Sequence, residues 1–174
     1  MTLFNNKYRI ESARLKTWDY GSDAPYFITI CTKGKEHFFG EIEKEEMILN
    51  DAGKIVEEEW LSTQSMRADM NIELEIFTVM PNHFHAIISI GQNEFNSFRP
   101  LDYKNEFGIQ SKNLASIIRG FKSAVTRKIR EEIEYFAWQG RYHDHIIRNH
   151  KEYLQIRNYI SDNPKNWQQD KFYR

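Results

Sequence analysis

The chain has 174 residues, 40% of them hydrophobic and 28% charged, which is the composition of a folded globular domain. Its apolar runs fall far below the roughly 20 residues that span a bilayer, and no apolar signal-peptide core follows Met1, so a membrane or secreted protein is not expected. The single cysteine, Cys31, excludes an intramolecular disulfide framework and fits a reducing, cytoplasmic setting.

Charge is distributed unevenly along the chain, although the net charge is only −1. Residues 36–75 carry 3 basic and 12 acidic side chains, whereas residues 111–174 carry 13 basic and 7 acidic ones. This asymmetry is typical of a protein with one face for a polyanion, and it fits two solvated faces of opposite sign equally well.

Residues 1–25 mix basic and aromatic side chains and are expected to form an N-terminal extension, ahead of one domain over residues 26–174. β-branched and alternating segments then predict strands, and one amphipathic segment predicts a helix. In chain order we expect a strand over 26–33 and short extended runs over 37–40 and 46–49. A helix over 52–64 follows, capped by Asn50 or Asp51. Strands over 71–80 and 83–90 then lie on either side of a turn at Pro81 and Asn82.

Residues 91–110 have no clean period and are expected to form a loop. A long helix is predicted over 114–136, because apolar residues recur there every four positions: Ile117, Phe121, Val125, Ile129 and Ile133. A short strand over 145–148 and a helix over 151–162 follow. This order predicts an α+β fold, a ferredoxin-like split β-α-β antiparallel sheet with helices on one face and an appended C-terminal helix.

His83-Phe84-His85 is the sharpest candidate for chemistry. Strand residues i and i+2 point to one face, so the two imidazoles converge while Phe84 packs on the other face. That geometry suits a divalent ion, although a third ligand must come from elsewhere. Histidines on the wet face of a strand are the alternative. His143 and His145 have the same spacing, as a second ligand pair or as residues of an edge strand.

Tyr159 lies on the predicted last helix, and Asn163 shares its helix face four residues later. Tyr159 can therefore present its hydroxyl beside an amide oxygen at a metal. The alternative is a boundary tyrosine with a packed ring and a wet hydroxyl.

Several motifs together resemble the REP-associated tyrosine transposases, relatives of the insertion-sequence-200 type within the HUH class of single-tyrosine transposases. Met80 to His85 resembles the family's (M/L)PNHxH strand junction. Trp138-Gln139 with Tyr142 to Arg148 resembles its WQ…Y.DH.IR stretch, and Tyr153 to Pro164 resembles its Y….YI..NP helix. The likeness extends from about Tyr26 to Trp167.

The resemblance implies metal-dependent cleavage and strand transfer on single-stranded DNA through a 5′-phosphotyrosine. It assigns Tyr159 as the nucleophile, His83 and His85 as ligands of Mg²⁺ or Mn²⁺, and Asn163 as a third ligand. The implied substrate is a hairpin-forming palindrome, and the implied location is a bacterial, nucleoid-associated cytoplasm. Insertion-sequence relatives can act as dimers, whereas REP-associated relatives can work as monomers, so the resemblance allows a homodimer and leaves the oligomeric state open.

Basic side chains on the long helix are candidates for phosphate contacts, namely Arg119, Lys122, Arg127 and Lys128. Three alternatives stay open. One is a hairpin-DNA-binding regulator without catalysis, and another is a relaxase- or replication-initiator-type nickase. The third is a small metal-dependent hydrolase, which needs a carboxylate near His83 and His85 that the sequence does not indicate.

Overall fold

A computed structural model describes residues 15, 17–98 and 111–173, so most of the predicted extension and part of the predicted 91–110 loop lie outside the described residues. The strands are β1 Ala24–Cys31, β2 Gly40–Glu43, β3 Glu46–Leu49, β4 Ile72–Met80, β5 His83–Ile90 and β6 His143–Ile146, and the helices are α1 Asp51–Met66, α2 Leu114–Ile129 and α3 His150–Asp162. Short 3₁₀ turns occur at Lys33–Lys35, Ala68–Met70 and Trp167–Gln169. Within the described ranges, no helix is both long and apolar enough to cross a membrane.

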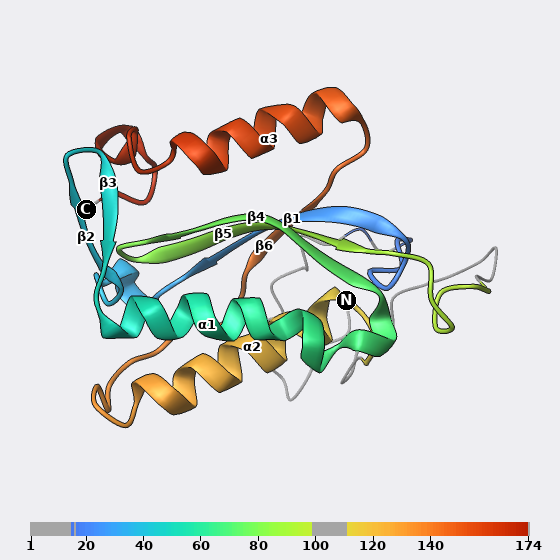
Figure 1. The fold of residues 1–174 in the computed structure, drawn as a ribbon, viewed down its shortest axis with the longest axis horizontal. Helices are drawn as coiled ribbons and strands as arrows, with labels where there is room; N and C mark the ends of the chain where they lie inside the picture. The colour runs from blue at the N-terminus through green and yellow to red at the C-terminus, as the bar shows by residue number, and fades with distance from the viewer. Residues whose placement is uncertain (1–14, 16, 99–110, 174) are drawn as a thin grey trace, which may run out of the picture.

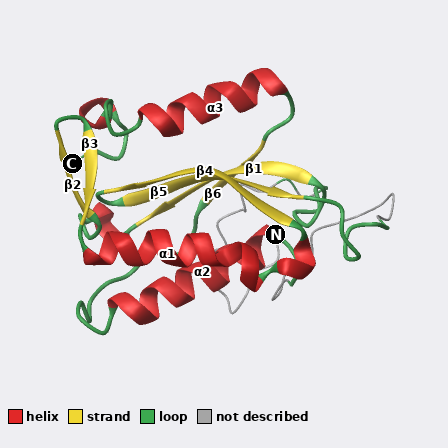
Figure 2. Cartoon of the chain, viewed as in Figure 1, coloured by secondary structure: helices red, strands yellow, loops and turns green. Residues whose placement is uncertain are grey.

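The main sheet has four antiparallel strands in the order β4-β5-β1-β6. This order confirms the predicted ferredoxin-like split β-α-β fold. Figure 1 shows α1 and α2 together on one side of the sheet and α3 on the other. Strands β2 and β3 form a separate hairpin at one end (Figure 2). Because the sheet is covered on both sides, its two faces can serve different purposes.

The main hydrophobic core lies between the sheet and the α1–α2 layer. Phe84 of β5 is fully buried there, with its ring centroid 4.9 Å from that of Trp60 on α1 and 5.4 Å from that of Phe121 on α2. Side chains alternate along a strand, so the residues on either side of Phe84 point away from this core. The packing of Phe84 therefore places His83 and His85 on the α3 face.

A second, smaller core lies under α3. Ile160 of α3 is fully buried and packs with Ile87 of β5 and Ile147, which follows β6. Ile156 and Tyr153, one and two turns earlier on α3, pack against this cluster. These contacts fix the rotation of α3 over the sheet and hence the position of Tyr159.

Several element boundaries differ from the prediction, among them that of β1, which covers Ala24–Cys31 rather than 26–33. α2 ends at Ile129, well before residue 136, because the chain turns there: the Arg130 Nε–H donates to the Phe136 carbonyl (2.9 Å), and Phe136 is fully buried. β6 covers His143–Ile146 rather than 145–148, because the Arg148 N–H already bonds a carboxylate of α3. The run over 37–40 is not a strand. Its Phe38 and Phe39 are buried, and β2 begins at Gly40.

Candidate active site

His83 and His85, hereafter the His pair, lie together on the α3 face of β5. Both side chains are fully buried, and their ring centroids are 4.5 Å apart. Burial lowers the pKa of His83 from 6.5 to about 4 and lowers that of His85 well below its ordinary value. Both imidazoles are therefore neutral at physiological pH, which is the state that binds a metal ion.

Asn82 determines which nitrogen of His83 carries the proton. The Asn82 amide donates to the backbone carbonyls of Lys35 (3.1 Å) and Phe172 (2.9 Å), which leaves its oxygen facing the Nδ1 of His83 at 2.8 Å. An amide oxygen only accepts, so Nδ1 must be the protonated nitrogen. The Nε2 lone pair of His83 is then directed to the site, and this buried atom has no hydrogen-bond partner among the described residues.

His85 is held from both sides. Its Nδ1 is 2.8 Å from the hydroxyl of Thr29, the residue opposite it on β1. Phe27, also on β1, stacks on the imidazole with ring centroids 5.4 Å apart. The remaining nitrogen, Nε2, points toward α3.

Tyr159 of α3 meets this nitrogen. Its hydroxyl lies 3.2 Å from the Nε2 of His85 and 3.3 Å from a carboxylate oxygen of Asp170. Burial, and then the charge of Asp170 beside it, raises the pKa of the Tyr159 phenol. The hydroxyl is thus protonated, and it can donate to the carboxylate.

Asn163 and Asp170 complete the cluster. Asn163 is the C-cap residue of α3, and its side-chain amide donates to Asp170 at 2.7 Å. Its oxygen is buried and has no hydrogen-bond partner among the described residues. The nearest ligand atoms of His83, His85 and Asp170 all lie within 4.8 Å of one another. The structure thus brings together all four predicted catalytic and metal residues and adds Asp170.

The donor set of this cluster fits a divalent cation. It offers two neutral imidazole nitrogens, a carboxylate and an amide oxygen, which are ligand types found for Mn²⁺ and Mg²⁺. Two buried acceptors, the Nε2 of His83 and the oxygen of Asn163, are left without donors. Because a buried acceptor without a partner costs free energy, a cation would satisfy both at once.

Asp170 was missed by sequence reasoning, and it supplies the carboxylate that the hydrolase alternative lacked. It follows the short Trp167–Gln169 turn, where no period marks an inward-facing side chain. Its only sequence signal is that it lies shortly after a helix that already carries Tyr159 and Asn163. The turn folds back and lays Asp170 against the His pair.

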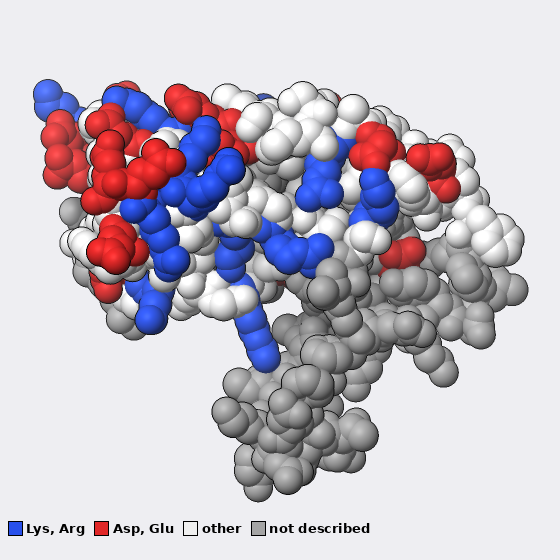
Figure 3. Space-filling model, turned by 90° about the horizontal axis from the view of Figure 1, so that it is seen from below, with Lys and Arg blue, Asp and Glu red and all other residues white. Residues whose placement is uncertain are grey.

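The four predicted DNA-binding residues are not at this cluster. Arg119, Lys122, Arg127 and Lys128 all belong to α2, on the other side of the sheet. Figure 3 looks onto that side and shows Lys and Arg side chains running through its middle. Lys128 is paired with Glu59 of α1 at 2.5 Å, and Glu59 is buried.

His143 and His145 do not form a second metal site with the His pair. β6 is the edge strand that was one of the two expectations. The Nε2 of His145 bonds a carboxylate oxygen of Glu152 at 2.7 Å, and the other oxygen of Glu152 accepts from the Arg148 N–H. These contacts hold the start of α3 against β6.

No family model matches the sequence. An uncharacterized protein of Haemophilus influenzae is 42% identical over 167 residues, which cover 93% of this chain and 92% of that protein. A solved structure of a REP-associated tyrosine transposase bound to a REP hairpin superposes with a TM-score of 0.59 at 18% sequence identity, and the match covers 91% of this chain and 74% of that one. At this identity the likeness establishes a transposase-like fold.

Proposed function

We propose that this chain, which belongs to the same family as the Haemophilus influenzae protein, cleaves and rejoins single-stranded DNA through Tyr159 with a divalent cation. One observation carries the proposal: the Tyr159 hydroxyl lies 3.2 Å from the Nε2 of His85, within a cluster of metal-ligand side chains. A tyrosine that only fills a boundary position has no need of such partners.

The chemistry that this geometry supports is a transesterification. The Tyr159 oxygen attacks a backbone phosphorus, a new P–O bond forms to tyrosine, and the bond from phosphorus to the 3′ oxygen breaks. The products are a 5′-phosphotyrosine and a free 3′-hydroxyl, so one phosphodiester replaces another and no ATP is needed. Asp170, which accepts the hydrogen bond of the phenol, is placed to receive its proton, and the proton ends on the 3′ oxygen.

The cation would be held by the His pair, Asp170 and Asn163. When bound, a divalent ion polarises the phosphate and offsets the charge that develops on its oxygens. Mn²⁺ suits two imidazole ligands better than Mg²⁺ does, because imidazole is the softer kind of donor. The roles of the chain itself are to keep both imidazoles neutral and to aim the Nε2 of His83 through Asn82.

The proposed substrate is a hairpin-forming single strand in the cytoplasm. The REP-associated transposase with the similar fold was solved bound to a REP hairpin, which supports this substrate class. The basic side of α2 supports a polyanionic partner as well, because cations that neutralise backbone phosphates supply most of the affinity for DNA.

A covalent-capture assay tests the proposal. The protein is mixed with labelled hairpin strands, including those flanking its own gene, with and without Mn²⁺, and adducts are detected on denaturing gels and mapped by mass spectrometry. We expect a metal-dependent adduct on Tyr159. The adduct should disappear in Tyr159→Phe and survive in Tyr153→Phe, the matched tyrosine on the same helix. Adduct that persists in Tyr159→Phe would contradict the assignment.

A metal-dependent hydrolase is the second candidate, and Asp170 is the observation that favours it. In that case water, rather than Tyr159, attacks the phosphorus, and the same cluster holds the cation. Metal-dependent cleavage without any protein-linked DNA, and its survival in Tyr159→Phe, would support the hydrolase. Tight hairpin binding with neither cleavage nor adduct would instead support a non-catalytic regulator.

A further inference from the structure

The helix layer has a groove of about 500 Å³ between α2 and the segment that leads into β6. We call it the α2 groove, and it is lined by Lys122, Ser123, Thr126, Arg127, Arg130, Ala137, Trp138, Gln139 and Gly140. Three of these side chains are basic and none is acidic. A hollow with only one sign of charge raises the local concentration of ions of the opposite sign.

The cations of the α2 groove are not neutralised by the groove itself. The Lys122 ammonium donates to the Gln139 carbonyl at 2.6 Å, and burial lowers the pKa of Lys122. The Arg130 Nε–H donates to the Phe136 carbonyl. Arg127 is exposed and has no ion pair or hydrogen bond within the described parts of the chain. Cations that are bonded only to carbonyls, or to nothing, leave a net positive charge that favours an anion.

Trp138, which lines the groove, carries a buried donor without an acceptor. Trp138 is 8% exposed, and its indole N–H has no hydrogen-bond partner among residues 15, 17–98 and 111–173. Beside it, a Cβ added at Gly140 would meet no atom within 4 Å, so the wall there is open. An N–H donor beside several cations is a combination that suits phosphate oxygens.

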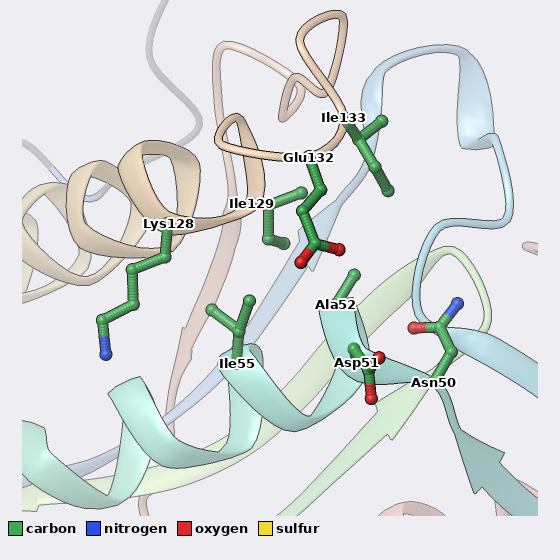
Figure 4. A pocket seen from close by; sticks show the side chains of 8 residues that line it. All are labelled: Asn50, Asp51, Ala52, Ile55, Lys128, Ile129, Glu132 and Ile133. Carbon is green, nitrogen blue, oxygen red and sulfur yellow. The ribbon is translucent and has the colours of Figure 1, made fainter.

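A second hollow, of about 210 Å³, lies between the start of α1 and the end of α2, and it lacks this character. Figure 4 shows Glu132 pointing toward the start of α1, with Ile129 beside it and Ile55 below on α1. Asp51 and Glu132 line it beside Lys128, whose charge is already matched by Glu59. Of these two hollows, the α2 groove is therefore the one whose lining suits an anion.

The α2 groove lies close to the His pair, although on the other face of the sheet. The backbone carbonyl of Gln139 accepts from Lys122, and the backbone N–H of Gln139 donates to the carbonyl of Cys31 at 2.8 Å. Cys31 is the residue opposite His83 in the β1–β5 ladder. Neighbouring strands lie about 4.8 Å apart, so only this edge of the sheet separates the groove from the cluster.

We propose that the α2 groove binds backbone phosphates of the DNA substrate, so that the substrate crosses the sheet edge at residues 138–142 to reach Tyr159. This inference rests on the proposed function for the identity of the polyanion. Of the four predicted contacts it keeps Lys122 and Arg127 and adds Arg130. It leaves out Lys128, which is already paired, and Arg119, which does not line the groove. The proposed path also requires that the substrate has a single-stranded segment long enough to reach from the bound phosphates to the scissile bond.

Binding without cleavage tests the groove separately from the chemistry. A labelled DNA hairpin with a single-stranded flank is titrated in metal-free buffer at several salt concentrations. Arg127→Gln removes a cation with no structural partner, and Ser123→Glu adds a carboxylate to the groove. Lys54→Gln and Ser65→Glu make the same charge changes on α1, outside the groove.

We expect each groove variant to weaken binding about tenfold at low salt. Arg127→Gln should also lower the slope of log affinity against log salt by about one, the signature of one lost phosphate contact. The α1 controls should change neither. Equal effects in groove and control variants, no effect in either, or a wild-type chain that binds no hairpin would overturn the proposal. Weakened binding by groove variants, together with no wild-type adduct, would leave the groove standing and refute the proposed chemistry.

Discussion

Burying two imidazoles side by side costs free energy in a metal-free protein. Neither ring is exposed, and their centroids are 4.5 Å apart, so protonating one would place a cation against its neighbour in a medium of low polarity. The Asn82 amide and the Thr29 hydroxyl each fix one ring. Such second partners orient metal ligands, and a merely structural histidine pair has no need for both.

The stability of the metal-free protein should therefore fall in mild acid. The pKa of His83 is lowered to about 4 in the fold, whereas the unfolded chain takes up the proton near 6.5. The stability that the neutral ring contributes is present above pH 6.5 and is lost as the pH falls toward 4. We expect the free energy of unfolding to drop by up to about 1.4 kcal/mol per pH unit from this residue. Urea unfolding with a chelator across this window measures it.

The same titration of His83→Gln separates this residue from the rest of the chain. Glutamine cannot take up a proton, so the slope should become shallower, and His85, whose pKa is also lowered by burial, should account for part of what is left. An unchanged slope in His83→Gln would contradict the assignment.

Thr29 offers a cleaner test of the support behind the ligands. Thr29→Val keeps the β-branched shape in β1 and removes only the hydroxyl that bonds the Nδ1 of His85. We expect Mn²⁺ affinity to fall about tenfold or more, as for other losses of a ligand's hydrogen-bond partner. Isothermal titration with Mn²⁺ measures the change. Thr78→Val is the matched control, because Thr78 lies opposite His85 on the other neighbouring strand, β4, and should leave affinity unchanged.

At the scale of elements, α2 divides its basic side chains between two neighbours. Lys128 turns to α1 and neutralises the buried Glu59, whereas Lys122 and Arg127, with Arg130 just after the end of α2, line the α2 groove. The charge count of the last third of the chain cannot separate these duties, because residues one position apart on a helix point in different directions. Cations on one helix can thus be structural or functional.

Lys128→Gln should separate the two duties. Removing the ammonium leaves Glu59 buried without its partner, and we expect a loss of about 1–3 kcal/mol in the free energy of unfolding. Hairpin affinity should stay unchanged, unlike in Arg127→Gln. The double variant Glu59→Gln/Lys128→Gln should recover part of the stability, because it removes the unpaired charge. A Lys128→Gln protein of normal stability but weakened DNA binding would refute this division.

Most elements were predictable because each depends on a local pattern. The stripe on α2 is buried as expected at Ile117, Phe121 and Val125. The predicted end of α2 was wrong. Ile133 continues the apolar period of the helix in the sequence, but the chain turns earlier so that Phe136 is buried. A period in the sequence cannot reveal a tertiary contact that outweighs it.

The residues of the candidate site also differ in whether a local sequence pattern could predict them. The His pair follows from strand alternation, and Tyr159 with Asn163 follows from helix spacing, so local geometry was enough to propose them. Asp170 lies in an irregular segment after a 3₁₀ turn, and its position depends on how the chain folds back over β5. No pattern within a few residues of Asp170 encodes that return.

The whole molecule keeps its main core on one face of the sheet and the candidate site on the other. The aromatic core of Trp60, Phe84 and Phe121 stabilises the α1–α2 side. α3, which carries Tyr159, rests on the small cluster of Ile87, Ile147 and Ile160. A helix held by so few buried side chains can open without unfolding the sheet, and elements that open locally are common at binding sites.

Ile160→Ala should therefore act on the site before it acts on the fold. Truncating this fully buried side chain removes packing worth about 2–5 kcal/mol, and the loss falls on α3. We expect amide hydrogen exchange to accelerate within α3 while α1 and α2 keep their protection, and adduct formation on Tyr159 to fall in parallel. Ile118→Ala, an equally buried isoleucine of the main core, is the matched control.

In Ile118→Ala, exchange should accelerate across both helix layers, because the main core holds the whole sheet together. If Ile160→Ala also accelerated exchange everywhere, α3 would be part of the global folding unit, and Tyr159 could not move independently. If α3 instead opens alone, Tyr159 lies on the least stable of the helices, whereas the His pair stays fixed in the sheet. Access for DNA and the cation would then be controlled by the small cluster under α3, where substitutions should alter adduct yield without lowering the melting temperature of the main core.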